Sequence, residues 1–199
     1  MGRKSLKSTR QKEIIKVFYK VAKKIGLENT SIAKIAQEMD INPSLIMHYF
    51  KTKEDLTKGL IDYILDKYLM IYAVKSSDSA IDRLRGVLDN LFSAKWNRLV
   101  DDGLFYSCYA LSFRDKKVKE LYKALHDRLR ASLAELILEC KLQNGLKVGN
   151  PGHAAQVVYV LVDGAYYYLK LVSDKAEYSQ KLAIYKEQAF QVLGLGLQV

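Results

Sequence analysis

The fold is decided by residues 30–55, TSIAKIAQEMDINPSLIMHYFKTKED, which predict two short helices, a tight turn between them and the start of a third helix. Thr30 and Ser31 are the candidate N-caps of the first helix, because a hydroxyl there accepts a hydrogen bond from a free N–H of the first turn. Apolar residues then recur at helical spacing and give that helix one apolar face. Asn42, a favourable N-cap, and Pro43, which suits the first helical position, begin the second helix. A helix this short is stable only when it packs on its neighbours.

Two short helices joined by a turn of three or four residues form a helix-turn-helix, whose second helix enters the major groove of DNA. Thr52 then caps the next helix, and Asp55 lies three residues further on, as in a capping box. The N-terminus of that helix suits a phosphate group, because it offers free N–H groups and a positive dipole end. Lys51 and Lys53 flank the cap. We expect Lys53 and the helix end to be the main phosphate contact, which fixes the register without reading bases.

The outward side chains of the second helix are the candidate groove contacts. Ser44 can bond a base edge or a phosphate. Leu45 and Met47 can touch a thymine methyl group, and the alternative for both is packing in the core. His48 is a candidate phosphate or sugar contact, because no second metal ligand lies three or four residues away. Two apolar residues of the same helix are assigned to the core: Ile46 and Phe50.

A longer motif follows the turn: the string HYFKTKEDL, residues 48–56, comes after a first helix and the pairs Thr30-Ser31 and Ile35-Ala36. With this combination, residues 9–56 resemble the DNA-binding domain of the TetR family of bacterial transcriptional regulators. The resemblance implies that Tyr49 binds a phosphate through its hydroxyl while its ring packs. The chain departs from the family at Leu45, where a small polar residue is common, and at Met47, where tyrosine is common. The operator sequence therefore cannot be transferred from a relative.

The charge of the chain favours a polyanionic partner. The 199 residues carry a net charge of +10 and give a pI of about 9.4. Residues 1–58 hold 13 lysines and arginines against 6 aspartates and glutamates, so most of the excess lies beside the helix-turn-helix. A solvated surface is the alternative, but this position favours phosphate attraction. Residues 1–8 are expected to form a flexible basic arm in which Arg3, Lys4 and Lys7 reach a minor groove or phosphates, or else a tail without fixed contacts.

The rest of the chain predicts an all-α protein of about nine helices. Only two prolines occur, and apolar residues repeat at helical spacing throughout. The first helix is expected from Thr9 to Ile25, ended by Gly26 in a left-handed conformation. Together with the resemblance, this predicts a helix-turn-helix DNA-binding domain of three helices at residues 1–55 and a helical ligand-binding and dimerisation domain at residues 56–199.

A homodimer is predicted from the segment after Asn150, where residues 154–172 are apolar nearly all round. A helix without a polar face must be covered on two sides, and a second copy is the natural cover for one of them. The resemblance implies an interface of four helices, two from each chain. The alternative is an internal core in a monomer. The candidate interface residues are Tyr159, Gly164, Tyr167, Leu182, Tyr185 and Ala189.

The chain is rich in aromatic residues, with fourteen tyrosines and one tryptophan. The resemblance places several of them around a ligand cavity, and aromatic walls with a few hydroxyls suit an apolar or aromatic small molecule. Ordinary core packing is the alternative for each of them. The candidate ligand residues are Trp96, Phe105, Tyr106, Tyr109, Tyr122 and Tyr166.

Catalytic and metal-binding motifs are missing from the sequence. No nucleophile elbow, phosphate-binding glycine loop or zinc-type cysteine pair occurs, so we expect no enzyme, metal or cofactor. Cys108 and Cys140 are expected as buried reduced thiols, and His126 is expected at the surface. Neither a signal peptide nor a run of 18 apolar residues is visible, and we expect a cytoplasmic protein without membrane contact.

These observations predict a homodimeric repressor that a small, largely apolar or aromatic ligand of unknown identity releases from double-stranded, palindromic operator DNA. One alternative is a protein-interaction module or co-activator of the same fold with little or no operator binding. Another is an architectural DNA-binding protein without a small ligand.

Overall fold

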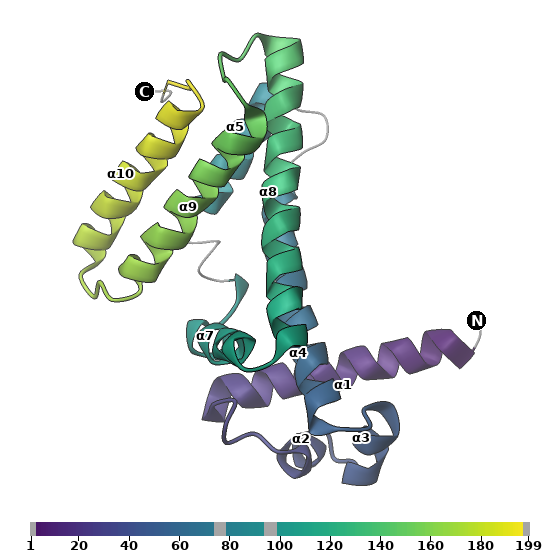
Figure 1. Ribbon diagram of the computed structural model, residues 1–199. Coiled ribbons are helices and arrows are strands. Elements are labelled where there is room, and N and C mark those ends of the chain that lie inside the picture. Colours follow the sequence, from purple (N-terminus) through teal and green to yellow (C-terminus); the bar gives the residue numbers. More distant parts are fainter. Residues whose placement is uncertain (1–2, 74–78, 94–98, 197–199) are drawn as a thin grey trace. The chain divides into compact units, whose positions relative to one another are not determined.

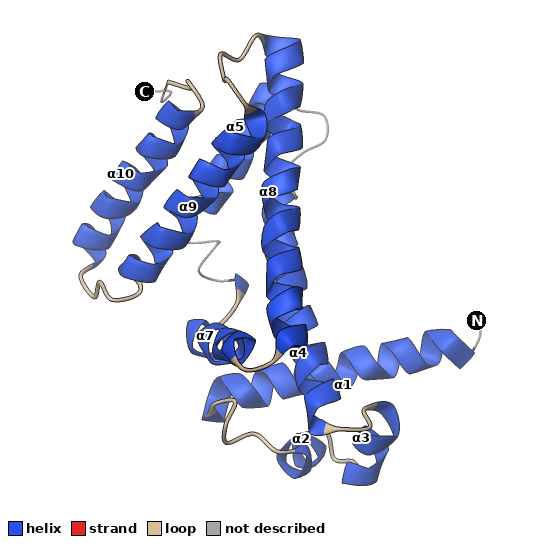
Figure 2. Cartoon of the chain, in the orientation of Figure 1, coloured by secondary structure: helices blue, strands red, loops and turns tan. Residues whose placement is uncertain are grey.

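The computed structural model describes residues 3–73, 79–93 and 99–196, and the regular structure in these ranges is helical without a strand (Figures 1 and 2). The all-α prediction is therefore confirmed. The longer helices are α1 (Arg3–Ile25), α2 (Ile32–Glu38), α3 (Pro43–Tyr49), α4 (Lys53–Tyr68), α5 (Ala80–Leu91), α7 (Asp102–Ala110), α8 (Lys116–Asn144), α9 (Pro151–Leu169) and α10 (Lys175–Val192). Two short 3-10 segments continue α4 and α7: η1 (Leu69–Tyr72) and η2 (Leu111–Phe113).

The chain forms two compact units. The first comprises Met1–Tyr68 and Val100–Lys123, and the second comprises Leu69–Leu99 and Ala124–Val199. These units do not follow the predicted division after residue 55, because α4 packs on α1 and belongs to the first unit. The approach is close at Gly59, where an added Cβ would lie 2.9 Å from the Ile15 side chain and 3.3 Å from Phe50. The functional division at residue 55 stays a prediction.

The core of the first unit gathers one apolar face from each of its first four helices. Phe18 of α1, Ile35 of α2, Ile46 of α3 and Leu60 of α4 are all fully buried. Helix α1 ends as predicted, because Gly26 has the left-handed φ of +88°. These contacts hold the two short helices α2 and α3, which are too short to be stable alone.

The N-terminal arm is an expectation that the structure corrects. Residues 1–8 were expected to be flexible, but α1 begins at Arg3 and runs without interruption to Ile25. No proline or glycine lies within this range. Because arginine, lysine and leucine are good helix formers, the helix continues past Thr9 without a cap.

The core of the second unit is built mainly from α5, α8, α9 and α10. The inward face of α9 includes Val158, Val162 and Leu169. Helix α10 packs beside α9, as Figure 1 shows, and contributes the buried Phe190. Helix α9 therefore has one face covered by its own chain.

Both cysteines are buried free thiols, as predicted: Cys108 in the first unit and Cys140 in the second. Burial raises the pKa of Cys108 to about 12 and that of Cys140 to about 11. Because the thiolate is the reactive form, these cysteines are structural residues.

Candidate nucleic-acid interface

Helix α3 presents a short polar and apolar surface to solvent. The side chain of Asn42 accepts a hydrogen bond from the Ser44 N–H at 2.9 Å, and Pro43 occupies the first turn. Ile46 has none of its surface exposed, so the opposite face points outward. Met47 lies on that outward face with 53% exposure, together with the exposed Ser44 and His48. One side of α3 is therefore anchored and the other is available to a partner.

Two residues predicted on this helix are only partly exposed: Leu45 and Tyr49. The carbonyl of Tyr49 accepts a hydrogen bond from the side-chain amide of Gln11 at 3.2 Å, which ties the end of α3 to α1. The Tyr49 ring meets the His48 ring edge to face, with 5.2 Å between centroids. These contacts fix the direction in which α3 ends.

The start of α4 lies directly after α3. The Thr52 hydroxyl accepts a hydrogen bond from the Asp55 N–H at 3.0 Å, which is the predicted cap. Lys51 and Lys53 are exposed, and neither makes an ion pair within the described ranges. Glu54 and Asp55 lie in the first turn and oppose an anion there. Phosphate attraction at this point therefore depends on the two lysines as well as on the helix end.

The two hydroxyl residues before α2, Thr30 and Ser31, have different roles. Ser31 is the N-cap, since its side chain accepts a hydrogen bond from the Lys34 N–H at 3.3 Å, and it is exposed. Thr30 is only 2% exposed, and its hydroxyl donates to the Gly26 carbonyl at 2.7 Å. Thr30 is therefore a correction: it closes the end of α1 and has no side-chain surface to offer to DNA. Lys4 lies on α1, but its side chain is outside the described part.

Four of the predicted ligand residues come together in the first unit. Phe105, Tyr106 and Tyr109 lie on α7, and Tyr122 lies on α8. The ring centroids of Phe105 and Tyr122 are 5.7 Å apart, and those of Tyr109 and Tyr122 are 5.1 Å apart. The ring centroid of Tyr68, on α4, lies 5.3 Å from that of Phe105. We call these five residues the aromatic cluster.

The remaining two predicted ligand residues do not join the aromatic cluster. Tyr166 belongs to the second unit, where its hydroxyl donates to the carbonyls of Leu91 and Ser93 at 2.8 and 3.2 Å. Trp96 lies outside the described residues.

The predicted interface residues fall on different sides of α9 and α10. Tyr159 and Ala189 are fully buried within the chain, so both are corrections: neither has surface to offer to a second copy. Tyr167 is 70% exposed and Gly164 is exposed, while Leu182 and Tyr185 are partly exposed. The prediction missed four exposed residues with large apolar side chains: Val160, Tyr168, Leu171 and Ile184.

The exposed residues of α9 follow a helical spacing that identifies its outer face. Val160, Gly164 and Tyr167 are separated by four and three residues, and Leu171, just past the helix end, follows after four more. Sorting the segment by this spacing would have separated the outer from the buried face, because Tyr159 does not fit it. We call these four residues the outer face of α9.

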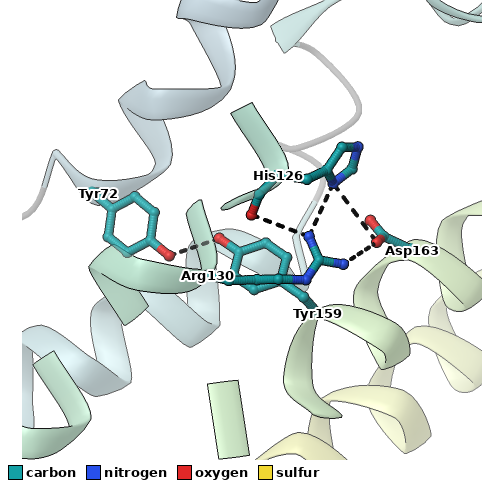
Figure 3. Close-up of polar contacts among 5 residues, drawn as sticks. All are labelled: Tyr72, His126, Arg130, Tyr159 and Asp163. Atoms are coloured by element: carbon teal, nitrogen blue, oxygen red, sulfur yellow. Dashed lines mark hydrogen bonds and ion pairs between the residues drawn. The ribbon is translucent and has the colours of Figure 1, made fainter. Parts of the chain in front are cut away.

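A polar cluster of the second unit lies between α8 and α9 (Figure 3). Arg130 is hydrogen-bonded to Asp163 at 3.0 Å and to the Nδ1 atom of His126 at 3.1 Å. His126 was expected at the surface, but it is half-buried in this cluster. Arginine has no acceptor atom, so Nδ1 of His126 is the acceptor and the neutral ring carries its proton on Nε2.

We expect acidification to destabilise the fold through His126. Burial lowers its pKa below the usual 6.5, and the opposing effect of Asp163 is smaller. As the pH falls below about 6.5, the unfolded chain takes up the proton first, so the folded state loses stability. The melting temperature should therefore fall between about pH 7 and pH 5.5. His126→Gln, which keeps an acceptor for Arg130, should flatten that slope, and an unchanged slope would contradict this assignment.

Two kinds of feature are absent from the residues that the structure describes. No helix there is both long enough and apolar enough to cross a membrane. In the same ranges, no three histidine, cysteine, aspartate or glutamate residues are grouped as metal ligands would be.

Comparison with known proteins gives matches over both parts of the chain. The family described as bacterial regulatory proteins, tetR family, matches residues 14–60. The tetracyclin repressor-like C-terminal domain matches residues 79–195, which is more than half of the chain.

Individual relatives and solved structures agree with these matches. The HTH-type transcriptional regulator BetI of Stenotrophomonas maltophilia is 22% identical over 136 residues, which cover 67% of this chain and 69% of the relative. The nucleoid occlusion factor SlmA of Vibrio vulnificus is 27% identical over 148 residues, with coverage of 71% and 73%. A TetR transcription regulator from Haloarcula marismortui has a similar fold, with a TM-score of 0.79 at 20% identity over 94% of this chain and 97% of that one.

Proposed function

Because the chain belongs to the TetR family of bacterial regulators, we propose that it is a repressor that binds operator DNA as a homodimer and is released by a small, largely apolar or aromatic ligand. The observation that carries this proposal is the outward face of α3. Ser44, Met47 and His48 are exposed on a helix that is capped at its start and anchored by the buried Ile46. Such a helix can insert into a major groove without losing its own support.

The contacts proposed for DNA fall into two groups. Base edges are read by Ser44 and Met47, with Leu45 at the margin of the same face. Phosphates are held by a second group, which positions the protein without reading sequence. This second group comprises Ser31, His48, Tyr49, Lys51 and Lys53, and Lys4 is added to it from the sequence alone.

Lys53→Ala should weaken binding to all DNA sequences alike. The removal of one phosphate contact releases one counterion fewer, so the slope of log affinity against log salt should fall by about one unit. Fluorescence anisotropy at several salt concentrations, with specific and unrelated duplexes, measures both effects. Ser44→Ala is the matched control, because it should change sequence preference while leaving the salt slope nearly unchanged. Loss of discrimination in Lys53→Ala would contradict the role of Lys53.

The homodimer is supported by the outer face of α9. Three exposed apolar side chains lie along one line of this face, beside the exposed Gly164: Val160, Tyr167 and Leu171. A second copy packed there would cover the side that the chain itself leaves open. Two recognition helices reach successive grooves of a palindromic operator when they lie about 34 Å apart.

The aromatic cluster supports release by a ligand. Its rings come from α4, α7 and α8 and lie in the same unit as the helix-turn-helix. In the dimer, the two helix-turn-helix regions (the DNA-binding heads) have one arrangement on DNA and another when free. A ligand that binds between these rings would need different affinities for these two arrangements. A small difference in head spacing is sufficient, since both recognition helices must meet their grooves at once. Tyr166 and Trp96 stay candidates from the sequence for the same ligand.

An electrophoretic gel shift with the DNA upstream of the protein's own gene tests the proposal. We expect retardation at nanomolar protein, competed poorly by unrelated DNA. The absence of a shift at low salt would contradict operator binding.

The second candidate function is a protein-interaction module of the same fold. It is favoured by one observation: the relative from Vibrio vulnificus is named a nucleoid occlusion factor and not a transcription regulator. In that case the protein acts by binding another protein. Ser44→Ala and Lys53→Ala, which change only proposed DNA contacts, should then leave its effect in cells unchanged.

A further inference from the structure

Two tyrosines tie η1 to the rest of the second unit (Figure 3). The Tyr72 hydroxyl donates to the carbonyl of Leu129 on α8 at 2.6 Å and lies 2.7 Å from the Tyr159 hydroxyl of α9. Tyr72 has one hydroxyl proton, and the Leu129 carbonyl takes it. Tyr159 is therefore the donor in the bond between the two hydroxyls, and the bonds have one direction, from α9 to η1 to α8.

The chain of contacts continues from Tyr159 to solvent. The Arg130 guanidinium lies 5.2 Å from the centre of the Tyr159 ring, a cation–π contact. The same guanidinium donates to Oδ2 of Asp163 at 3.0 Å. Asp163 is 42% exposed and precedes Gly164 on the outer face of α9. A continuous set of contacts thus runs from the outer face of α9 to Tyr72.

The η1 segment occupies a particular place in the chain. It follows α4 directly, and it is the first segment of the chain that belongs to the second unit. The side-chain amide of Asn90 also donates to the Ile71 carbonyl at 3.1 Å, so η1 is held from two sides. A 3-10 turn is common at the C-terminal end of an α-helix, and η1 extends α4 in this way. Whatever fixes η1 therefore fixes the segment that follows α4 in the chain.

We propose that Asp163, Arg130, Tyr159 and Tyr72 form a relay. Through it, a second copy bound to the outer face of α9 stabilises η1 against local opening. This inference depends on the homodimer proposed above. A second copy would remove water from Asp163, and the attraction between Asp163 and Arg130 is stronger in a lower dielectric. The guanidinium is then held against the Tyr159 ring, and the hydroxyl pair keeps Tyr72 on the Leu129 carbonyl. Dimerisation and the stability of η1 are coupled in this way.

Hydrogen exchange at the end of η1 tests the relay. The N–H of Ala73 donates to the Met70 carbonyl at 3.0 Å, so its exchange rate reports opening of this segment. At a concentration where sedimentation shows every variant to be a dimer, Asp163→Asn should speed exchange of Ala73 about threefold. Tyr72→Phe, which removes both hydroxyl bonds, should speed it about fivefold.

The double variant separates a relay from two independent effects. In a relay, Asp163→Asn adds almost nothing once Tyr72→Phe has broken the last link, so the double variant should match Tyr72→Phe alone. Glu187→Gln is the matched control, because Glu187 is an exposed acidic residue of α10 whose hydrogen-bond partner is Gln191. It should leave the exchange of Ala73 unchanged.

The outcomes distinguish this inference from the proposed function. Multiplicative effects of the two substitutions, or no effect of Asp163→Asn, would overturn the relay while the dimer stands. Sedimentation that shows only monomers at all concentrations would reject the homodimer and the relay with it. Slower exchange of Ala73 in the wild-type dimer than in the diluted monomer, with the non-additive pattern, would support the relay.

Discussion

Tyr167→Glu should convert the protein to a monomer and lower its operator affinity by a factor of about 100 or more. Tyr167 is 70% exposed at the middle of the outer face of α9, with Val160 and Leu171 on either side. A carboxylate there would be buried without a partner when two copies meet, and two copies would place two such charges near each other. A monomer has one recognition helix, so it loses the gain in affinity that comes from two linked half-sites.

Analytical ultracentrifugation and binding to a full operator and to a half-site measure these two effects. The variant should bind the half-site as the wild-type monomer does, because α3 is unaffected. Leu142→Glu is the control, since Leu142 is as strongly exposed but lies on α8. It should leave the dimer intact. A Tyr167→Glu dimer of normal affinity would show that the outer face of α9 is not the interface.

The predictions that held were those whose physical cause is local. Asn42 and Pro43 begin α3, and Thr52 caps the start of α4, as their side-chain chemistry requires. Gly26 adopts a positive φ because the end of a helix often needs one. In these cases the residues that interact are within a few positions of each other, so the sequence contains the whole cause.

Helix α9 shows why the interface was only partly predicted. Its residues are apolar on nearly every side, so the pattern alone does not state which side the chain itself covers. Tyr159 is buried because Tyr72 and Arg130, far away in the sequence, lie against it. Among the described residues, no such group meets Tyr167, eight positions further on, and this side chain stays exposed. Tertiary contacts therefore decide which of these two tyrosines of α9 is buried and which is exposed.

The polar cluster around Arg130 was missed for the same reason. His126 lies between Leu125 and Asp127 and has the sequence context of a surface residue. It is half-buried beside Asp163, which comes from another helix and lies 3.9 Å from its Nδ1 atom. The start of α1 is a different case: Arg3 to Ser8 contain no apolar periodicity, but helix propensity alone extends the helix through them.

Ile46→Ala should cost about 2–5 kcal/mol of folding stability and abolish operator binding. Ile46 has no exposed surface and fixes α3 on the core of the first unit. Because α3 has only seven residues, it cannot persist without this anchor. The cavity left by the lost side chain therefore affects both the fold and the position of the groove contacts. Thermal or urea unfolding and anisotropy with operator DNA measure the two losses.

Met47→Ala is the matched comparison, because it changes the next residue of the same helix. Met47 is 53% exposed, so its truncation should alter the stability by no more than about 0.5 kcal/mol. It should instead change which bases are preferred in a binding-site selection, since an apolar contact to a thymine methyl is lost. If Met47→Ala destabilised the fold as much as Ile46→Ala does, the assignment of an inner and an outer face to α3 would be wrong. If both variants were stable and kept the same base preference, α3 would not be the helix that reads the operator.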